Sequence, residues 1–280
     1  MRPGRGARAA LALGAAALGV YGAWIEPRRL VVRRQELALP RWPAALAGLR
    51  VGVMSDLHAG VLHAGEPALA RWVEGINAAA PDLVLLAGDF TDAHWLFGRR
   101  IAPERIAERL AALEAPLGRV AVLGNHDWKA FGMRMWTALA RAGIPVLEND
   151  SVAFDAPGGR LHVAGIADVR FRRPDVHRAL AGVPDGEPAI VLSHDPDIFP
   201  FVPARAALTV SGHTHRGQVA IPYARVPFLP TRHGERFSHG HIVEHGRHLF
   251  IGAGLGTSGL PVRLLAPPEL PVLELHPGAA

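Results

Sequence analysis

The sequence of 280 residues predicts an α/β fold in which helices flank mixed β-sheets. Hydrophobic residues make up 49% of the chain, which is enough for a sizeable core. Short apolar runs recur along the chain, and each ends at Gly or Ser, as expected of strands that are buried on both faces. The six runs span residues 49–55, 82–88, 119–124, 189–193, 207–212 and 248–254.

Helical patterns separate the first three apolar runs. Apolar residues spaced by three or four positions form stripes that predict helices packed against a sheet. Residues 145–168 instead contain two extended segments joined by a Gly-Gly turn, which predicts a hairpin. The two helical stripes consist of Leu69, Trp72, Val73 and Ile76, and of Ile106, Leu110 and Leu113.

We predict that residues 1–26 are an N-terminal signal anchor or signal peptide. The apolar run over residues 9–25 is short for a membrane-spanning helix, and Arg2, Arg5 and Arg8 precede it. Three alternatives stay open: an uncleaved anchor, which we favour, a cleaved secretory signal, and a soluble or interfacial helix. Positive charge flanks both ends of the run, so the side of the membrane is undetermined.

Charge is distributed unevenly along the chain. Residues 1–50 hold nine Arg and two Glu, a net charge of +7, whereas residues 51–280 carry a net charge of −2. The basic leader suits an anionic membrane surface, and the slightly acidic remainder argues against nucleic acid as a partner. The chain has no cysteine, which excludes disulfides, thiolate metal ligands and cysteine nucleophiles. We divide the rest into a basic connector (27–48), one domain (49–270) and a C-terminal tail (271–280).

Polar side chains follow five of the apolar runs. The carboxyl ends of strands are where open α/β sheets place their ligands. Each side chain alone is explained as a helix cap or a turn residue, but carboxylates and imidazoles gathered in one buried place need compensation. Oxygen and nitrogen ligands without sulfur suit Mn, Fe, Zn, Co or Ni. The residues are Asp56, His58, Asp89, Asn125, His126, Asp127, His194, His213 and His215.

The motifs DLH, GDFTD, GNHD, H and GHTH, in this order, resemble those of the calcineurin-like metallophosphoesterase superfamily over about residues 49–260. The resemblance implies an enzyme that hydrolyses phosphoesters, with a four-layer α-β-β-α sandwich and two divalent metal ions. It implies that His126 acts on the substrate beside the ions, that Asp127 orients His126, and that Asp92 lies behind the ligands. A hydroxide between the ions would be the nucleophile. The implied ligands are Asp56, His58 and His215 for one ion, Asn125, His194 and His213 for the other, and Asp89 for both.

Residues 254–270 and the basic, apolar N-terminus resemble a bacterial membrane-associated phosphodiesterase branch, similar to UDP-2,3-diacylglucosamine hydrolases of lipid A synthesis. We therefore expect an envelope lipid-linked or nucleotide-sugar substrate at the bacterial inner membrane, and no protein partner is predicted. The alternatives are a general phosphodiesterase, a nuclease and a non-catalytic scaffold.

Two local features stay open. Residues 254–258 are expected to form either a plain turn or a turn that faces an anion, and Arg263 either supports a phosphate or lies on the surface. The C-terminal histidines suit a solvated strand or hairpin better than a third metal site. They are His233, His239, His241, His245 and His248.

Overall fold

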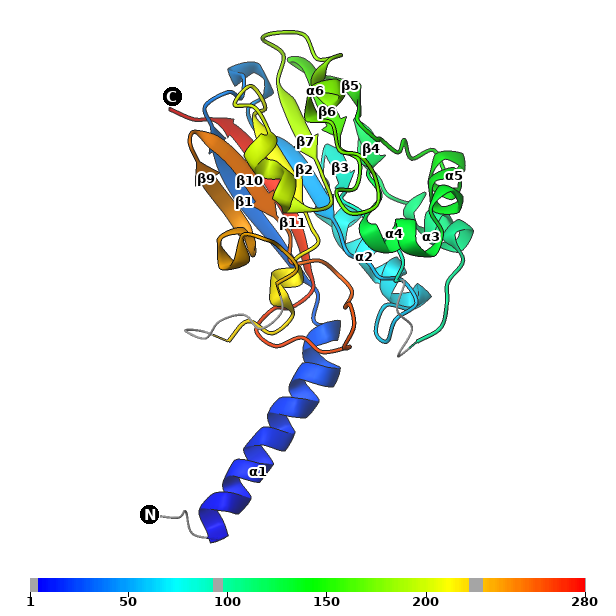
Figure 1. Ribbon diagram of the computed structural model, residues 1–280, viewed down its shortest axis with the longest axis vertical. Helices are drawn as coiled ribbons and strands as arrows, with labels where there is room; N and C mark the ends of the chain where they lie inside the picture. The colour runs from blue at the N-terminus through cyan, green and yellow to red at the C-terminus, as the bar shows by residue number, and fades with distance from the viewer. Residues whose placement is uncertain (1–4, 93–97, 222–228, 280) are drawn as a thin grey trace.

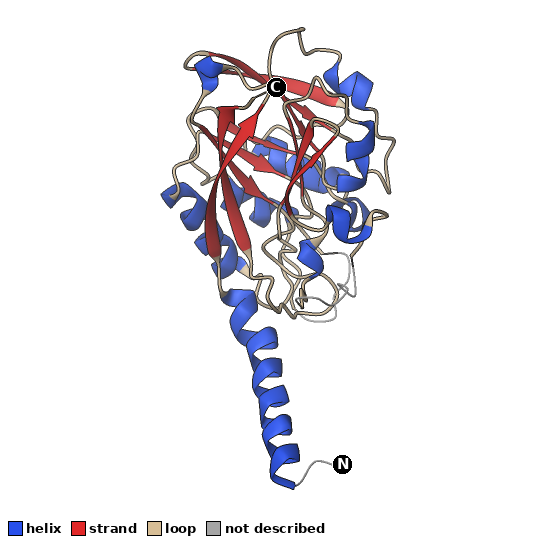
Figure 2. Cartoon of the chain, turned by 90° about the vertical axis from the view of Figure 1, so that its left-hand side faces the viewer, coloured by secondary structure: helices blue, strands red, loops and turns tan. Residues whose placement is uncertain are grey.

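Two mixed β-sheets lie face to face, and helices cover the outer face of each (Figure 2). The computed structural model describes residues 5–92, 98–221 and 229–279. The strand order is β1-β11-β2-β3-β4 in the first sheet and β5-β6-β7-β8-β10-β9 in the second. The predicted fold class, an α-β-β-α sandwich, is confirmed.

Each sheet has parallel strands at its centre. In the first sheet β2, β3 and β4 are parallel, and β11 is antiparallel to β2 but parallel to β1. In the second sheet β6, β7, β8 and β10 are parallel, and β5 and β9 are antiparallel edges. All six predicted strands and the hairpin are present. The strands are β1 (Val31–Leu39), β2 (Leu49–Met54), β3 (Leu83–Leu86), β4 (Gly118–Ala121), β5 (Asp150–Ala156), β6 (Gly159–Gly165), β7 (Ala189–Leu192), β8 (Leu208–Ser211), β9 (Gly240–Glu244), β10 (Arg247–Ile251) and β11 (Glu269–Pro277).

Two segments that the sequence analysis left outside the domain are strands within it. Strand β1, in the predicted connector, pairs along its whole length with β11, which extends into the predicted tail. The boundaries at residues 48 and 270 were therefore wrong. Strand β1 lies at the edge of the sheet and exposes Arg33 and Arg34, so its charges concealed the strand pattern. Pro271 concealed β11, but it lies one residue before the pairing with β2 begins.

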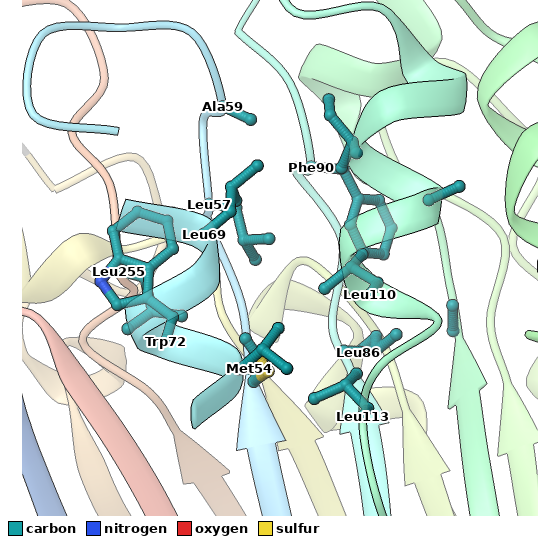
Figure 3. Packing of buried hydrophobic residues seen from close by; sticks show 14 of the residues in the cluster. Met54, Leu57, Ala59, Leu69, Trp72, Leu86, Phe90, Leu110, Leu113 and Leu255 are labelled. Carbon is teal, nitrogen blue, oxygen red and sulfur yellow. The ribbon is translucent and has the colours of Figure 1, made fainter. Parts of the chain in front are cut away.

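Helices α2 (Glu66–Ala78), α3 (Pro103–Leu110) and α5 (Met133–Arg141) cover the first sheet, and α6 (Val176–Leu180) covers the second. The predicted stripes face inward: Trp72 of α2 and Leu110 of α3 pack with Met54, Leu86 and Phe90 (Figure 3). A second apolar layer fills the space between the sheets. This packing holds the carboxyl ends of the parallel strands in fixed positions.

The N-terminal helix projects away from the sandwich (Figure 1). Helix α1 (Arg5–Val20) continues through a π-helical turn (Tyr21–Ile25) and a 3-10 turn (Glu26–Arg28). Residues Arg8–Arg28 make a helix that is long and apolar enough to cross a membrane, and most of it is exposed. Its end contacts two loops of the sandwich, because Arg263 N–H donates to Gly22 O at 2.9 Å and His63 Nε2 lies 2.8 Å from Ala23 O.

Candidate metal centre

The predicted site residues meet where β2, β3, β4, β7 and β8 end. Five of them have a left-handed backbone, with φ between 43° and 71°. Residues other than glycine rarely adopt this conformation, and when they do, it is often at functional sites. The fold therefore holds several polar side chains in a costly conformation at one place. The five are Asp56, His58, Asp89, His213 and His215.

One cluster consists of Asp56, His58 and His215, and all three side chains are buried. The Nε2 atoms of His58 and His215 are 3.0 Å apart. His215 Nε2 is also 3.3 Å from Asp56 Oδ1. Three potential donors to one cation thus converge.

A second cluster consists of Asp89, His194 and His213. His194 Nε2 lies 3.1 Å from Asp89 Oδ2 and 3.0 Å from His213 Nδ1. The same Asp89 oxygen is 3.7 Å from His58 Nε2, so this carboxylate lies between the two clusters. This is the position that a bridging ligand requires.

Asn125 begins helix α4 (Asn125–Ala130), beside the second cluster. Its neighbour His126 donates its backbone N–H to Asp89 Oδ1 at 2.9 Å. The buried Oδ1 atom of Asn125 has no hydrogen-bond partner among the described residues. A buried amide oxygen needs a partner, and a cation would supply one. The donor set of imidazoles, carboxylates and one amide without sulfur therefore fits two divalent ions.

Two glycines give the carboxylates room. A Cβ atom on Gly124 would lie 2.2 Å from Asp89 Oδ1, and one on Gly212 would lie 2.4 Å from Asp56 Oδ2. Any larger residue would displace a candidate ligand. This close approach explains the glycine in front of both the Asn-His-Asp and the His-Thr-His sequences.

The structure corrects the predicted partner of His126. The carboxylate of Asp127 does not serve this ring: it accepts hydrogen bonds from Gly124 N–H at 3.0 Å and Thr91 N–H at 3.1 Å. Asp127 thus caps α4, which is the ordinary role of an acidic residue in the first helical turn. Asp92 takes the predicted place, with Oδ1 3.3 Å from His126 Nδ1 and Oδ2 3.1 Å from His58 Nδ1.

Burial and neighbouring charges set the protonation of these groups. Burial holds the pKa of His213 and of His215 well below the usual range, so both rings are neutral and can donate a lone pair. Burial alone would lower the pKa of His194 and raise that of Asp89. Their mutual attraction reverses both shifts, so that the pKa of His194 is well above the ordinary value and that of Asp89 well below.

Sequence reasoning missed two polar contacts at the centre. Ser258 Oγ lies 3.4 Å from His126 Nε2, and no pattern in the sequence pairs these residues. Asp195 Oδ2 lies 3.5 Å from His213 Nε2. Because Asp195 directly follows the predicted ligand His194, the sequence could have indicated that Asp195 lies at the centre.

The structure settles the role of Arg263 and the contacts of the turn at residues 254–258, which the sequence left open. Arg263 is fully buried, so it neither lies on the surface nor supports a phosphate. Its guanidinium donates to backbone carbonyls of residues 253, 254, 256 and 266 and so holds this loop together. The amides of Leu255 and Gly256 are bonded to Ser55 O and Asp56 O, so these two N–H groups do not face an anion.

Strands β9 and β10 form a hairpin, as expected for the histidine-rich region, and they bring together His241 and His248. The two rings stack, with nitrogens 3.0 Å apart. Within the described residues, the groups of three or more potential ligands all lie at the centre above.

Two clusters with the Asp89 carboxylate between them, and the His126 ring beside them, define a hydrolase with a dinuclear metal centre. A profile of the calcineurin-like phosphoesterase family matches residues 49–217. The chain belongs to this family, whose members are metallophosphoesterases that act on phosphoester bonds with two divalent metal ions.

Similar proteins come from bacteria and animals. An uncharacterized metallophosphoesterase of Bacillus subtilis, YkuE, is 28% identical over 277 residues, which cover 97% of this chain and 95% of that protein. The UDP-2,3-diacylglucosamine pyrophosphatase LpxG of Chlamydia trachomatis is 26% identical, with 90% of this chain and 91% of that protein covered. A transmembrane protein with metallophosphoesterase domain of Danio rerio is 29% identical, with 91% of this chain and 59% of that protein covered.

Proposed function

We propose that this protein hydrolyses a phosphodiester or pyrophosphate bond of an envelope lipid-linked substrate such as UDP-2,3-diacylglucosamine. The observation that supports this proposal most is that the metal centre contacts the same loop as the membrane-compatible helix, which projects from one end of the sandwich (Figure 1). The loop of residues 253–266 contacts Gly22 on one side and Asp56 on the other. A reacting group on a lipid embedded in the membrane would thus be close to the centre. The similarity to LpxG supports the same substrate class.

In this proposal Asp56, His58 and His215 would hold one ion, Asn125, His194 and His213 would hold the other, and Asp89 would serve both. Two divalent ions would supply a water of lowered pKa and neutralise phosphoryl oxygens. His126, which is partly exposed beside the clusters, faces the substrate with Nε2 and gives a proton to the leaving oxygen. Asp92 fixes the ring through Nδ1. Asp127 contributes by holding the start of α4.

We infer that the N-terminal segment is a retained anchor at the bacterial inner membrane. Glu26 is buried, and its carboxylate accepts hydrogen bonds from Leu265 N–H at 2.9 Å and Ala266 N–H at 2.8 Å. Gly22 is also buried against the same loop. Cleavage close to these residues would remove contacts that the folded domain uses, which supports an anchor over a cleaved signal.

The test uses the full chain in phosphatidylcholine nanodiscs, stripped of metal and reloaded with Mn, Zn, Fe(II), Co or Ni. Hydrolysis of UDP-2,3-diacylglucosamine and of bis-p-nitrophenyl phosphate is measured in parallel for the wild type and for Asp89→Ala, His126→Ala and His241→Ala. We expect metal-dependent cleavage of both substrates. It should be lost in Asp89→Ala, fall about 10²–10⁴-fold in His126→Ala and persist in His241→Ala, whose histidine lies on β9.

Cleavage of the chromogenic diester alone would remove the proposed substrate and leave a general phosphodiesterase. Equal inertness of the wild type and His126→Ala towards both substrates, with metal bound, would favour a scaffold. Tight, steeply salt-dependent binding of DNA would favour the nuclease.

A further inference from the structure

A largely apolar groove of about 630 Å³ opens beside the metal centre. His215 and Ser258 form its wall at the centre, and Val219, Leu260 and Val262 line it farther along. Its volume is in the range of small-molecule binding sites. A ligand in this groove would therefore lie directly against a candidate metal ligand.

The described lining residues offer little to a polar ligand. Apart from His215, none of them is ionisable. Gln218 is already engaged, because its Oε1 accepts from Ser258 N–H at 2.6 Å and its Nε2 donates to Leu260 O at 3.2 Å. A sugar or a nucleobase would find few hydrogen-bond partners in this groove, whereas a hydrocarbon chain needs none.

The far wall of the groove touches the membrane-compatible helix. Gly22 packs against Val262, where a Cβ atom built on the glycine would be 3.5 Å from Val262 Cγ1. The neighbouring Arg263 N–H donates to Gly22 O. The groove is thus continuous with the point at which the chain would leave the membrane.

Exposed apolar side chains surround this point. Trp24 is 56% exposed, Leu260 62% and Leu265 47%. Arg28 lies over the Trp24 ring at 3.5 Å. A tryptophan with a basic neighbour at the end of an apolar helix is typical of the membrane–water interface. With the N-terminal helix anchored as proposed above, the mouth of the groove would be at the height of the lipid head groups.

We propose that this groove binds one hydrocarbon chain of a membrane lipid whose phosphoester group lies at the metal centre. The inference rests on the proposed function and deepens it, because it assigns the site that recognises the lipid. The chain enters from the membrane beside Gly22 and runs past Val262 and Leu260 towards His215. The groove then favours lipid phosphoesters over soluble ones with the same head group.

The experiment measures inhibition of bis-p-nitrophenyl phosphate hydrolysis by butyl, hexyl and octyl phosphate. The Mn-loaded full chain in phosphatidylcholine nanodiscs is compared with Leu260→Asp, which places a charge in the groove wall, and with Leu265→Asp. Leu265 is exposed on the same loop but does not line the groove. Partition of the alkyl phosphates into the bilayer is the same for all three proteins.

We expect the inhibition constant of the wild type to fall at least about tenfold from butyl to octyl phosphate, since each fully buried methylene strengthens binding about fourfold. This dependence should vanish in Leu260→Asp and persist in Leu265→Asp. A chain-length dependence that is absent from the wild type, kept in Leu260→Asp, or lost equally in both variants would overturn the inference. If the wild type shows the chain-length dependence but does not cleave UDP-2,3-diacylglucosamine, the proposed substrate is wrong and the proposed lipid-binding groove is retained.

Discussion

Replacing Asp92 with Asn separates two explanations of how His126 is held at the metal centre. The Asp92 carboxylate lies 3.3 Å from His126 Nδ1 and 3.1 Å from His58 Nδ1, so it serves two rings at once. Asn has the same shape but carries no charge, and it presents an amide nitrogen to one of the two rings. Asp127→Asn changes the neighbouring carboxylate, which instead accepts two backbone N–H groups.

The magnitudes follow from these contacts. Loss of a carboxylate behind a metal-binding histidine typically lowers metal affinity or activity 10–100-fold, about 1.4–2.8 kcal/mol. We therefore expect Asp92→Asn to lower kcat on bis-p-nitrophenyl phosphate by about 10–100-fold. Asp127→Asn keeps one acceptor oxygen and leaves one of the two backbone N–H groups at the start of α4 without a partner, which costs about 1–3 kcal/mol of folding free energy. It should lower Tm by about 2–12 °C and affect kcat much less.

The measurements are kcat at saturating Mn, calorimetric titration of the metal-free protein with Mn, and thermal unfolding, all on the full chain. A kcat that falls as far in Asp127→Asn as in Asp92→Asn, with an unchanged Tm, would refute the assignment. The reasoning would also fail if Asp92→Asn changed neither kcat nor the affinity for Mn. In that case the sequence-based pairing of His126 with Asp127 would have to be restored.

Three further outcomes are expected. Gly212→Ala places a Cβ atom 2.4 Å from Asp56 Oδ2 and should lower activity about 10²-fold. Gly65→Ala, whose Cβ would make an ordinary contact with Pro67 Cδ at 3.7 Å, should leave activity unchanged. Equal rates of the two variants would contradict the close-packing argument. Chelation of the metal should abolish activity and lower Tm, and added Mn should restore both; a Tm that chelation leaves unchanged would argue against the centre. Glu26→Gln keeps one acceptor oxygen, so one of the two backbone N–H groups of residues 265–266 loses its acceptor. Thermal unfolding should then show a Tm lower by about 2–12 °C. An unaltered Tm would mean that the Glu26 carboxylate does not stabilise this loop.

The candidate ligands could be predicted because their placement depends on few unknowns. Within one sheet the carboxyl ends of parallel strands lie at the same edge, so polar residues after β2 and β3 come together, as do those after β7 and β8. The family resemblance implied that the two sets meet. The role of Asp127 could not be predicted in the same way. It follows His126 in sequence, but the first turn of α4 directs its carboxylate back to Gly124 N–H, and Asp92 reaches the ring from another loop. Adjacency in the chain is a poor guide to adjacency of side-chain atoms.

Long-range pairing explains most of what the sequence concealed in the fold. Residues 31–39 form strand β1 because β11, more than 230 residues later in the chain, pairs with them. Nothing local distinguishes its basic residues from those of a linker. The burial of Arg263 is similar, since a lone arginine in a Pro-rich tail predicts exposure. Only the folded loop brings backbone carbonyls around the guanidinium and makes burial of the charge tolerable.

The backbone contributes directly to the position of the candidate ligands. Left-handed backbone at a non-glycine residue costs on the order of 1–3 kcal/mol, and five such residues meet here. The carboxylates that would bind the ions also accept backbone N–H groups: Asp56 accepts from His213 at 3.0 Å, and Asp89 from His126 at 2.9 Å. These bonds partly offset the strain, because they tie each left-handed segment to a neighbouring strand end.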